Sequence, residues 1–464
     1  MEIFQDPVVL SRFQFAVTAM FHILWPVLTV GLSVALVIFE GLWLKTGDVD
    51  YYRHARFWGK LFVLNFSIGV ISGVPLEFEF GTNWSRFSTE TGEFFGNILG
   101  YEGAMAFMLE AGFLGIMLFG WSRVPPGIHW LATCMVALGA SLSVFWILVA
   151  NSWMQTPAGI HLDNHRVVVD SYMAAIFNKS MVWSVLHMWF ACMTTSLFVI
   201  GGVSAWYIQK RKYTDFFLKS FKLVLLGAIF VVPAQIVLGH LSGMHIFINQ
   251  PAKAAAVEAH WETNQEGQGA SWNVLAWPNQ AEQKNDWAIT VPNVLSLLAT
   301  GSRHGRVEGL SSFPPEDQPT AIGLIYYSFR IMVASGLAFL GLLAVTSVAW
   351  WKGGLSLERV CNHRLLLRAW IASIPLGYLA TECGWIVREV GRQPWVIYGV
   401  LRTHDAASNL PASVVATTLG GFIAVYGILL ILFMIFAARI IRKGPDLSFM
   451  PPSSQHLRET ADND

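Results

Sequence analysis

Charged residues are scarce in this sequence. Only 13% of its 464 residues are Asp, Glu, Lys or Arg and 54% are hydrophobic, whereas an ordinary soluble domain has roughly 25% charged residues. Acidic and basic residues are equally numerous, at 30 each, so the chain lacks the basic excess of a nucleic-acid-binding protein. These shortages exclude a soluble domain and a nucleic-acid partner. They predict a polytopic membrane protein in a lipid bilayer.

Cysteine motifs and processing signals are also missing. The four cysteines form no CxxC pair and no CxxCH motif, which excludes covalent c-type haem attachment and gives no sign of a disulfide framework. We interpret them as small core residues: Cys134, Cys192, Cys361 and Cys383. The opening segment MEIFQDPVVLSRFQF has no basic n-region, and no small-residue cleavage site follows the first apolar run. We therefore expect the first helix to be retained.

What the sequence has in abundance is long apolar runs. Runs of about 20 mostly apolar residues mark transmembrane helices, and nine of them predict an all-α membrane bundle with its termini on opposite sides. The predicted spans are 15–44, 57–80, 94–121, 127–150, 180–208, 217–240, 321–351, 364–390 and 412–441.

Basic residues between the spans predict the orientation, because short cytoplasmic loops carry an excess of Lys and Arg. They cluster after the first span, around the fifth and seventh connections, and at the start of the tail: Lys45, Arg53, Arg56, Lys60, Lys210, Arg211, Lys212, Lys219, Lys222, Lys352, Arg359, Arg364, Arg368, Arg439, Arg442 and Lys443. We expect the N-terminus outside and the C-terminus in the cytoplasm.

The spans divide the chain into four parts. Residues 1–240 hold the first six transmembrane helices, and residues 321–443 hold the last three. Between them, residues 241–320 form the one long connection, on the outer face; it is far longer than usual connections and is predicted to be functional. Residues 444–464, with PPSS and alternating charge, are predicted to be a disordered cytoplasmic tail.

One stretch, Arg368 to Trp395, combines an apolar helix with an embedded acid. Its sequence, RAWIASIPLGYLATECGWIVREVGRQPW, carries Glu382 well inside the helix. An ionisable side chain at such depth costs roughly 2.5 to 3.5 kcal/mol or more in lipid, so it normally faces the protein interior and has a function. We therefore expect other polar or ligand-type side chains at the same depth in the membrane as Glu382.

Other ligand-type side chains lie at comparable depth. With a rise of about 1.5 Å per residue, His22, Glu102 and Glu382 lie roughly 10 to 12 Å below the outer surface. By the same rise, His187 and Met332 lie roughly 10 and 16 Å below it. Singly, a histidine or methionine in an apolar helix is more often a packing residue than a ligand. Together they resemble axial ligands of porphyrins, because His with Met is a common low-spin pair.

Two neighbouring features allow more than one interpretation. Arg330, two residues before Met332, is suited to neutralise a haem propionate, or it could pair with Glu382 or a backbone carbonyl. Pro26 removes the helical donor from the carbonyl of His22, so the helix can kink there. Such a kink either admits a ring or is ordinary in a membrane helix.

Several longer motifs carry a specific resemblance. In chain order they are SRFQFAVTAMFH (11–22), WGKLFVLNF (58–66), EFEFGTNW (77–84), EGAMAFMLE (102–110), WILVANSWMQ (146–155), FRIMVASG (329–336) and GRQPW (391–395). With these motifs the sequence resembles subunit I of the cytochrome bd-type quinol oxidases over nearly its whole length. The resemblance implies a quinol:oxygen oxidoreductase of the respiratory chain, in the bacterial cytoplasmic (inner) membrane.

The resemblance also implies three haems. His187 and Met332 would hold a low-spin haem b. A high-spin haem b and a haem d would form the oxygen-reducing pair, with His22, Glu382 and Glu102 as ligands. Which haem of the pair binds His22 and which binds Glu382 stays open, as does a further haem b in place of haem d. The residues assigned to haem binding are His22, Glu102, His187, Arg330, Met332, Glu382 and Trp385.

The outer loop is implied to bind quinol, either ubiquinol or menaquinol. Lys253 and Glu258, in PAKAAAVEAHWET, match a lysine and a glutamate of the family's quinol site. Five residues apart on a helix, they would point about 140° away from each other, so they need a bend or separate roles. Without the resemblance they would be read as solvated loop residues. The loop is short and resembles that of the short-loop, often cyanide-insensitive branch, some of whose members carry haem b in place of haem d.

The resulting hypothesis is that quinol is oxidised outside and dioxygen is reduced to water at the di-haem centre, which generates a membrane potential without a proton pump. Catalytic roles are assigned to Glu102, Glu110 and Glu382. Glu110, about 12 Å beyond Glu102 along the helix and about 80° around it, is a candidate for delivering cytoplasmic protons; the alternative is a neutral acid that packs two helices. Expected partners are an integral-membrane subunit II and a small single-span accessory subunit.

Two other classes of function compete with this hypothesis. A proton-coupled transporter would use Glu102, Glu110 and Glu382 as proton or cation sites. It leaves the two embedded histidines and Met332 unexplained, and the sequence shows no internal repeat. A haem b quinone dehydrogenase would be coloured but would not consume oxygen.

Overall fold

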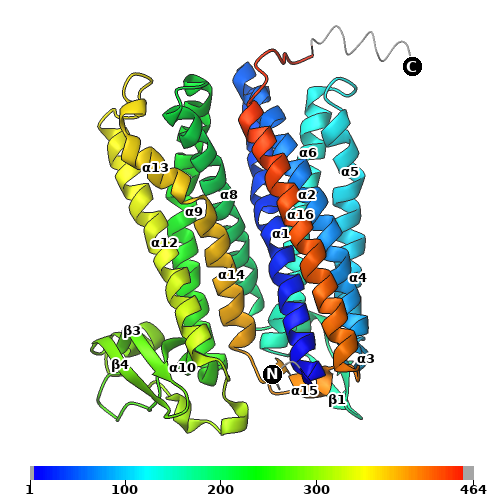
Figure 1. Cartoon of the computed structure of the whole chain (residues 1–464), viewed down its shortest axis with the longest axis vertical. Helices are drawn as coiled ribbons and strands as arrows, with labels where there is room; N and C mark the ends of the chain where they lie inside the picture. The colour runs from blue at the N-terminus through cyan, green and yellow to red at the C-terminus, as the bar shows by residue number, and fades with distance from the viewer. Residues whose placement is uncertain (1–4, 453–464) are drawn as a thin grey trace.

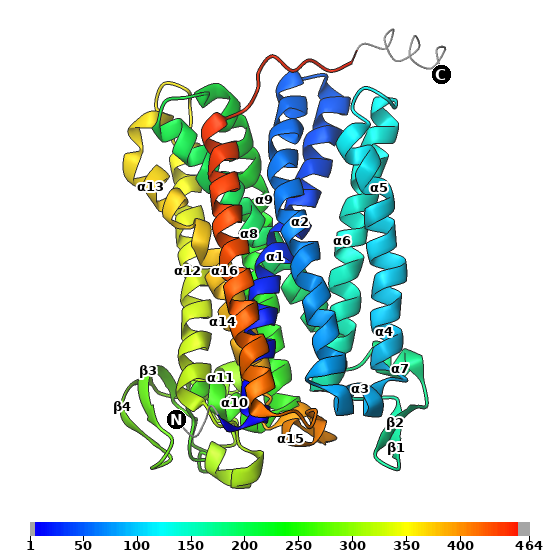
Figure 2. The ribbon, with the colours of Figure 1, turned by 45° about the vertical axis from the view of Figure 1, so that its right-hand side comes forward.

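The computed structural model describes residues 5–452, and its main feature is a bundle of long helices (Figures 1 and 2). In this part of the chain, eight helical segments are long and apolar enough to span a membrane. Seven are single helices: α1 (Pro7–Thr46), α2 (Val49–Thr82), α6 (Pro126–Gln155), α8 (Met181–Gln209), α9 (Thr214–Asn249), α12 (Ile322–Trp351) and α16 (Ala412–Lys443). The predicted all-α membrane fold is confirmed.

The eighth segment, Phe95–Phe119, is not a uniform helix. It consists of α4 (Phe95–Tyr101), the π-helix η2 (Glu102–Phe107) and α5 (Met108–Phe119). A π-helix turns less per residue than an α-helix, and such segments are frequent at functional sites. The angle of about 80° between Glu102 and Glu110, which assumes an uninterrupted α-helix, therefore does not hold.

The ninth predicted span, 364–390, is divided into α13 (Arg364–Ala372) and α14 (Ile374–Val390), which meet at Ser373. Pro375 explains the break, because it has no backbone N–H to donate and its ring clashes with the carbonyl of the preceding turn. Neither half alone is long enough to count as a span. Together they run along most of the bundle, and α14 carries Glu382 (Figure 1).

Shorter elements lie at the ends of the bundle. Five are α-helices: α3 (Ser85–Thr91), α7 (Tyr172–Ile176), α10 (Pro251–Glu258), α11 (Val294–Thr300) and α15 (Thr403–Ala406). Three are 3-10 segments: η3 (Leu310–Ser312), η4 (Pro315–Asp317) and η5 (Val360–Asn362). Six strands pair as antiparallel hairpins: β1 (Ile160–Asp163) with β2 (Arg166–Val169), β3 (Trp272–Asn279) with β4 (Lys284–Val291), and β5 (Trp395–Ile397) with β6 (Leu401–Arg402).

The long helices form two groups. One contains α8, α9, α12 and α14, and the other contains α1, α2, α5, α6 and α16 (Figures 1 and 2). Helix α1 joins the groups by packing against α8, where a Cβ on Gly31 would collide with Ser196. A Cβ on Gly201 of α8 would likewise collide with Trp370 of α13. Small residues at these crossings let the backbones approach closely, as is usual between membrane helices.

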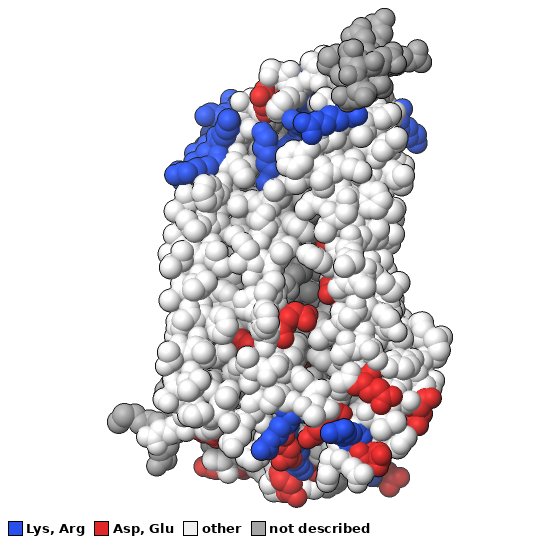
Figure 3. Space-filling model, turned by 90° about the vertical axis from the view of Figure 1, so that its right-hand side faces the viewer, with Lys and Arg blue, Asp and Glu red and all other residues white. Residues whose placement is uncertain are grey.

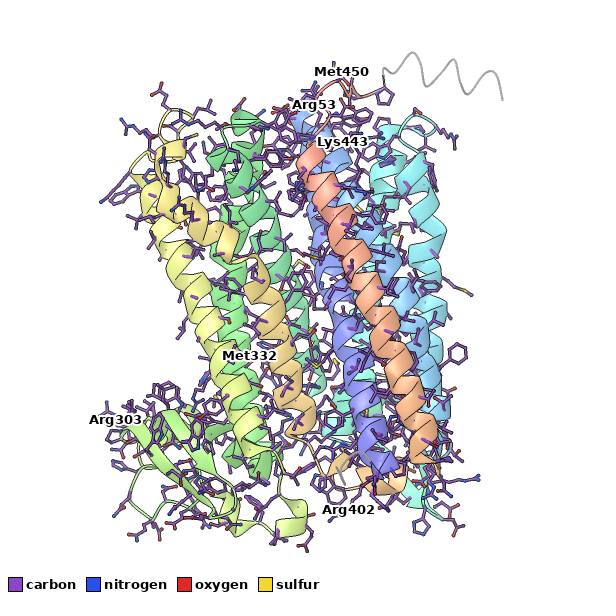
Figure 4. All side chains as sticks on the ribbon, in the orientation of Figure 1. Arg53, Arg303, Met332, Arg402, Lys443 and Met450 are labelled. Atoms are coloured by element: carbon purple, nitrogen blue, oxygen red, sulfur yellow. The ribbon has the colours of Figure 1, made fainter. Side chains whose placement is uncertain are left out.

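The two ends of the bundle differ in charge. On the face shown in Figure 3, Lys and Arg side chains form a band across one end, while acidic and basic side chains are mixed at the other. Arg53 and Lys443 lie at the basic end, and Arg303 and Arg402 lie at the mixed end (Figure 4). The hairpin β3–β4 and α10 lie at the mixed end (Figure 1). The long connection and the basic band therefore lie at opposite ends, as predicted.

Some boundaries differ from those predicted. Helix α9 continues to Asn249 instead of ending at 240, because LSGMHIFIN adds five large apolar residues without a proline. Lys253 and Glu258 lie on one short helix, α10, as their assumed spacing on a helix requires. All four cysteines are free, as expected. The part of the predicted disordered tail that covers 453–464 lies outside the described residues.

Candidate functional site

His187 and Met332 each face a glycine on a neighbouring helix. A Cβ added to Gly239 on α9 would lie 3.2 Å from His187 Cε1, and a Cβ added to Gly384 on α14 would lie 3.1 Å from Met332 Sδ. Nδ1 of His187 is buried and has no hydrogen-bond partner within residues 5–452. Both predicted ligands therefore belong to the group of α8, α9, α12 and α14. The missing glycine side chains leave room beside them.

His22 is held by a serine on α2. Its Nδ1 lies 3.0 Å from Ser72 Oγ, and that hydroxyl donates its own proton to the carbonyl of Gly69 at 3.0 Å. Nδ1 of His22 is therefore the donor, which leaves Nε2 unprotonated in the neutral ring. Fixing one ring nitrogen by a hydrogen bond is how proteins orient a histidine that binds a metal. Gly73 keeps this side of the ring open, because a Cβ there would lie 3.2 Å from His22 Cε1.

Glu382 is the most isolated acid of the bundle. Both of its carboxylate oxygens are buried, and neither has a hydrogen-bond partner in the described part of the chain. Trp385, one turn further along α14, packs against the cluster that contains Val27 of α1 and Cys192 of α8. Helix α14 therefore faces α12 through Gly384 and meets the cluster between α1 and α8 through Trp385. A buried carboxylate without partners is costly unless something binds it.

Glu102 begins the π-helix η2 and contacts α6. Ser143 Oγ donates to Glu102 Oε1 at 2.6 Å. Glu110 lies one turn beyond η2 and is buried, with its Oε1 unpartnered among residues 5–452. A Cβ on Gly139 of α6 would lie 2.9 Å from Glu110 Cβ. Both acids therefore face α6, so this helix connects them even though they share no direct hydrogen bond.

Lys253 is buried rather than solvated, with 2% of its surface exposed. Its Nζ donates to Gln155 Oε1 at 3.1 Å and to the carbonyl of Arg388 at 2.8 Å. Burial lowers the pKa of Lys253 well below its usual range, and the charge of Arg388 lowers it further. A Cβ on Gly391 would lie 3.1 Å from the Lys253 stem. The loop helix α10 is thus fastened onto the GRQPW motif.

Glu258, at the other end of α10, has a separate partner. Arg330 Nη2 donates to Glu258 Oε2 at 2.7 Å and to the carbonyl of Asn273 at 2.6 Å. Burial raises the pKa of Glu258, while the positive charge of Arg330 acts in the opposite direction. Of the alternatives open for Arg330, pairing with a backbone carbonyl is observed, and Glu382 is not its partner. Its Nη1 remains buried and unpartnered within 5–452.

A buried polar cluster that was not predicted from the sequence lies at the C-terminal end of α14. Arg388 donates to the side chain of Asn151 and, at 3.0 Å, to Ser184 Oγ. Arg392 Nη2 donates to Glu389 Oε2 at 2.5 Å, and Asn151 Nδ2 donates to Glu389 Oε1 at 3.0 Å. The signal was available, because WIVREVGRQPW places three charges in five positions at the end of an apolar helix. The cluster adds two guanidinium groups next to the helices that bear His187 and Met332.

Two buried histidines near the basic end have structural partners. His129 Nδ1 lies 2.9 Å from Glu40 Oε2, and Thr133 Oγ1 donates to Glu40 Oε1 at 2.8 Å. His54 Nε2 lies 3.0 Å from the carbonyl of Phe216. These contacts tie α1 to α6 and α2 to α9. They account for histidines that the sequence placed at the edges of spans.

The set of donors fits haem better than a bare metal ion. Residues 5–452 contain no group of three or more His, Cys, Asp or Glu placed to hold a metal ion. The predicted ligands lie singly on different helices, and a haem iron takes only axial ligands from the protein. The unpartnered atoms of His187 and Glu382, and the glycines that face His22, His187 and Met332, agree with this interpretation.

Comparisons with known proteins give one consistent result. Residues 10–445 match the model of the family described as cytochrome bd terminal oxidase subunit I. The chain is 36% identical to cytochrome bd ubiquinol oxidase subunit 1 of Bacillus subtilis, over 94% of both chains. It is 33% identical to cytochrome bd-II ubiquinol oxidase subunit 1 of Escherichia coli, over 95% of this chain and 97% of that one. Its structure is similar to that of bd oxidase from Geobacillus thermodenitrificans, with a TM-score of 0.87, 30% identity and coverage of 95% and 99%.

Proposed function

This chain belongs to the cytochrome bd terminal oxidase subunit I family, and from that premise we propose how its buried side chains serve a quinol:oxygen oxidoreductase. Quinol is oxidised at the mixed-charge end of the bundle, and dioxygen is reduced to water at a di-haem centre inside it. Protons from quinol are released outside, and those that form water come from the cytoplasm. The reaction therefore generates a membrane potential without a proton pump.

The haem positions follow from the ligand types. His187 and Met332 would hold a low-spin haem b, because a His and Met pair leaves no coordination position open. His22 and Glu382 would hold the iron atoms of a high-spin haem b and of a haem d or a further haem b, with Glu102 beside them. Bound there, the haems carry electrons from quinol to dioxygen.

The protein's own side chains orient and screen these groups. Ser72 fixes the ring of His22 through Nδ1, which leaves Nε2 free to bind iron. Arg330, Arg388 and Arg392 supply positive charge for carboxylate substituents of the haems, as guanidinium groups bind carboxylates well. Trp385 fills the space between the two groups of helices.

The quinol site is proposed around α10. Lys253 and Glu258 point to different partners, which supports separate roles: Lys253 fastens α10 to α14, and Glu258 accepts a proton from the quinol hydroxyl. Arg330 holds the Glu258 carboxylate in place. The raised pKa of Glu258 suits it to this task, because a general base works best when its pKa lies near the working pH.

Proton delivery is proposed to pass through Glu110. This acid lies further than Glu102 from the outer end of its span, and Ser143 of α6 contacts Glu102 while Gly139 of the same helix packs on Glu110. A buried acid in a membrane helix is costly unless it serves a path. Glu110 would pass protons towards Glu102 and the oxygen centre.

The orientation and localisation are proposed from the charge distribution. The band of Lys and Arg at one end (Figure 3) would lie in the cytoplasm by the positive-inside rule. The chain would then sit in the bacterial cytoplasmic (inner) membrane, with residue 5 and the outer loop outside and Lys443 inside.

Subunit II is the proposed main partner, with a small single-span subunit as a second one. Figure 3 shows carboxylates part-way along a face that is otherwise uncharged. On the helices of this side, Glu77 of α2 is exposed and Glu102 is half-buried. Acids at this depth are costly in lipid, so we place subunit II over the face formed by α2, η2 and α5.

The observation that carries the proposal is the pair of unpartnered carboxylate oxygens on Glu382; Gly384, two residues further along α14, faces Met332 of α12. A reduced-minus-oxidised spectrum with and without carbon monoxide, together with haem extraction, tests it. We expect one low-spin haem b and a carbon-monoxide-binding centre. A colourless protein would instead indicate a transporter, and a coloured one that consumes no oxygen would indicate a quinone dehydrogenase.

A further inference from the structure

The hairpin β3–β4 is amphipathic, but its apolar face is exposed. Along β4, Trp287, Ile289 and Val291 are 51%, 58% and 40% exposed, and they alternate with Asp286, Ala288 and Thr290. On the partner strand, Leu275 pairs directly with Ile289 and is 47% exposed, and Trp277 is 55% exposed. The pairing has register shifts next to Leu275 and Ala276, but Leu275 opposite Ile289 and Ala276 opposite Ala288 are in regular register. Strand residues two apart point to the same side, so the side chains next to these pairs form one surface. We call it the hairpin face: Leu275, Trp277, Trp287, Ile289 and Val291.

The other side of β3 is firmly held by the bundle. Asn273 Nδ2 donates to the carbonyl of Glu258 at 2.9 Å, and the carbonyl of Asn273 accepts from Tyr326 OH at 3.0 Å. Tyr327 OH donates to the carbonyl of Ala276 at 2.8 Å. Both strands therefore have a fixed position, and the exposure of the hairpin face does not come from a loose loop.

The hairpin lies beside a membrane helix rather than beyond its end. In Figures 1 and 2 it projects sideways from the bundle, next to the end of α12. The rings of Trp277 and Tyr327 are 6.3 Å apart, and Tyr327 lies in the second turn of α12, which begins at Ile322. Leu324 and Ile331 of the same helix are 52% and 42% exposed. Exposed apolar side chains therefore lie on α12 both before and after Tyr327, the residue that the hairpin contacts.

We propose that the hairpin face is a membrane anchor, which inserts into the headgroup region of the outer leaflet. Trp277 and Trp287 are the residue type that favours this region, because their rings are apolar and carry one polar N–H. The tip of the hairpin is suited to the aqueous side, with an exposed ion pair between Lys284 and Glu282 at 2.5 Å. The anchor holds β3, and through Asn273 the Glu258 and Arg330 pair, at a fixed height on the membrane surface.

Continuity with the lipid-facing surface of α12 favours lipid over another protein as the occupant. The apolar side chains on α12 continue into Trp277 through the Tyr327 ring. Ile248, in the last turn of the neighbouring α9, is also 74% exposed. A partner protein would have to cover this side of the bundle, whereas the acids that favour a protein partner, exposed Glu77 and half-buried Glu102, lie on α2 and η2. The inference does not depend on the oxidase reaction.

The test uses the alternation of side chains between the two sides of β4. Cysteines are placed singly at 286, 287, 288, 289 and 290, in a background with Cys134 and Cys361 changed to serine, and each is labelled with a nitroxide. The assembled holoenzyme is placed in nanodiscs of phosphatidylethanolamine and phosphatidylglycerol. Electron paramagnetic resonance then measures how far each label is accessible to oxygen, which concentrates in lipid, and to a water-soluble nickel complex.

We expect the ratio of oxygen to nickel accessibility to alternate along the strand. It should be several-fold higher at 287 and 289 than at 286, 288 and 290. Nickel access at all five positions would show that the face is in water and would overturn the proposal. Immobile labels at 287 and 289, reached by neither reagent, would show a covering protein and would overturn it as well. The spectrum and oxygen consumption of each variant establish that the enzyme is intact.

Discussion

Arg330 and Glu258 form a buried ion pair that joins a membrane helix to the long connection 241–320. Arg330 Nη2, on α12, lies 2.7 Å from Glu258 Oε2 at the end of α10, and their side chains are 12% and 6% exposed. Arg330 lies two residues before Met332 on the same helix. Glu258, the proposed base for quinol, is therefore bonded to a residue less than one helical turn from Met332, the proposed ligand of the low-spin haem.

Replacing Glu258 with Gln should stop quinol oxidation. Gln keeps the shape and can accept the Arg330 hydrogen bond, but it cannot take up a proton. We expect quinol turnover to fall roughly 100-fold or more, which is the usual contribution of a general base. Oxygen uptake with a quinol analogue measures this, while an artificial reductant should still reduce the haems. The exposed Glu262→Gln is the control, and normal quinol turnover in E258Q would place the site elsewhere.

The acid side of the pH profile should depend on Arg330. Burial raises the pKa of Glu258, so the group is protonated, and unable to accept a proton, up to a higher pH than an ordinary glutamate. Quinol turnover should therefore fall as the pH falls through this raised value. Arg330→Gln removes the charge that holds the pKa of Glu258 down, and should shift the fall in rate to higher pH.

The control for Arg330→Gln is the low-spin spectrum. An unchanged spectrum excludes loss of the haem as the cause of the shift. If the pH dependence of quinol turnover stayed the same in Arg330→Gln, or shifted to lower pH, the proposed role of the ion pair would be contradicted.

Replacing His187 with Ala should remove the low-spin haem. The absorption of that haem and electron entry from quinol should both be lost, because Met332 alone cannot supply two axial ligands. Binding of carbon monoxide at the other centre should persist. His240→Ala, which changes an exposed histidine next to Gly239, is the matched control. A wild-type low-spin spectrum in H187A would refute the assignment.

Replacing Gly384 with Val should displace Met332. A Cβ at this position already lies 3.1 Å from Met332 Sδ, so the two further methyl groups of Val leave no room for the thioether. We expect an altered low-spin spectrum with the carbon-monoxide-binding centre retained. Gly420→Val on α16, where a Cβ meets nothing within 4 Å, should change neither. Identical spectra for both variants would show that Met332 is not a ligand.

Replacing Glu110 with Gln should slow oxygen reduction but not haem reduction. Gln preserves the packing against Gly139 and cannot relay a proton by ionising. Steady-state oxygen consumption should fall roughly 100-fold, at the low end of effects of losing a proton-transfer group, and the membrane potential should fall with it. Glu79→Gln changes another buried acid, bonded to Thr18 near the other end of the bundle, and should remain active. Wild-type rates in E110Q would leave Glu110 as a packing residue.

The sequence by itself determined the class of the protein and the family to which it belongs. Apolar runs specify membrane helices, because a helix is the way to satisfy the backbone in lipid. The rise per residue then predicts a height for each side chain along its helix. The motifs of the family can also be identified from the sequence alone, without knowing how the helices pack.

Only the tertiary structure decided which side chains meet. Arg330 contacts Glu258 instead of Glu382, and Lys253 is buried on the Arg388 carbonyl instead of solvated. Such contacts depend on the rotation and lateral arrangement of helices, which come from packing between segments far apart in the chain. The break at Ser373 and the π-helix η2 also change these rotations. Height along a helix is a local property of the sequence, whereas neighbours across helices are set by the packing of the whole bundle.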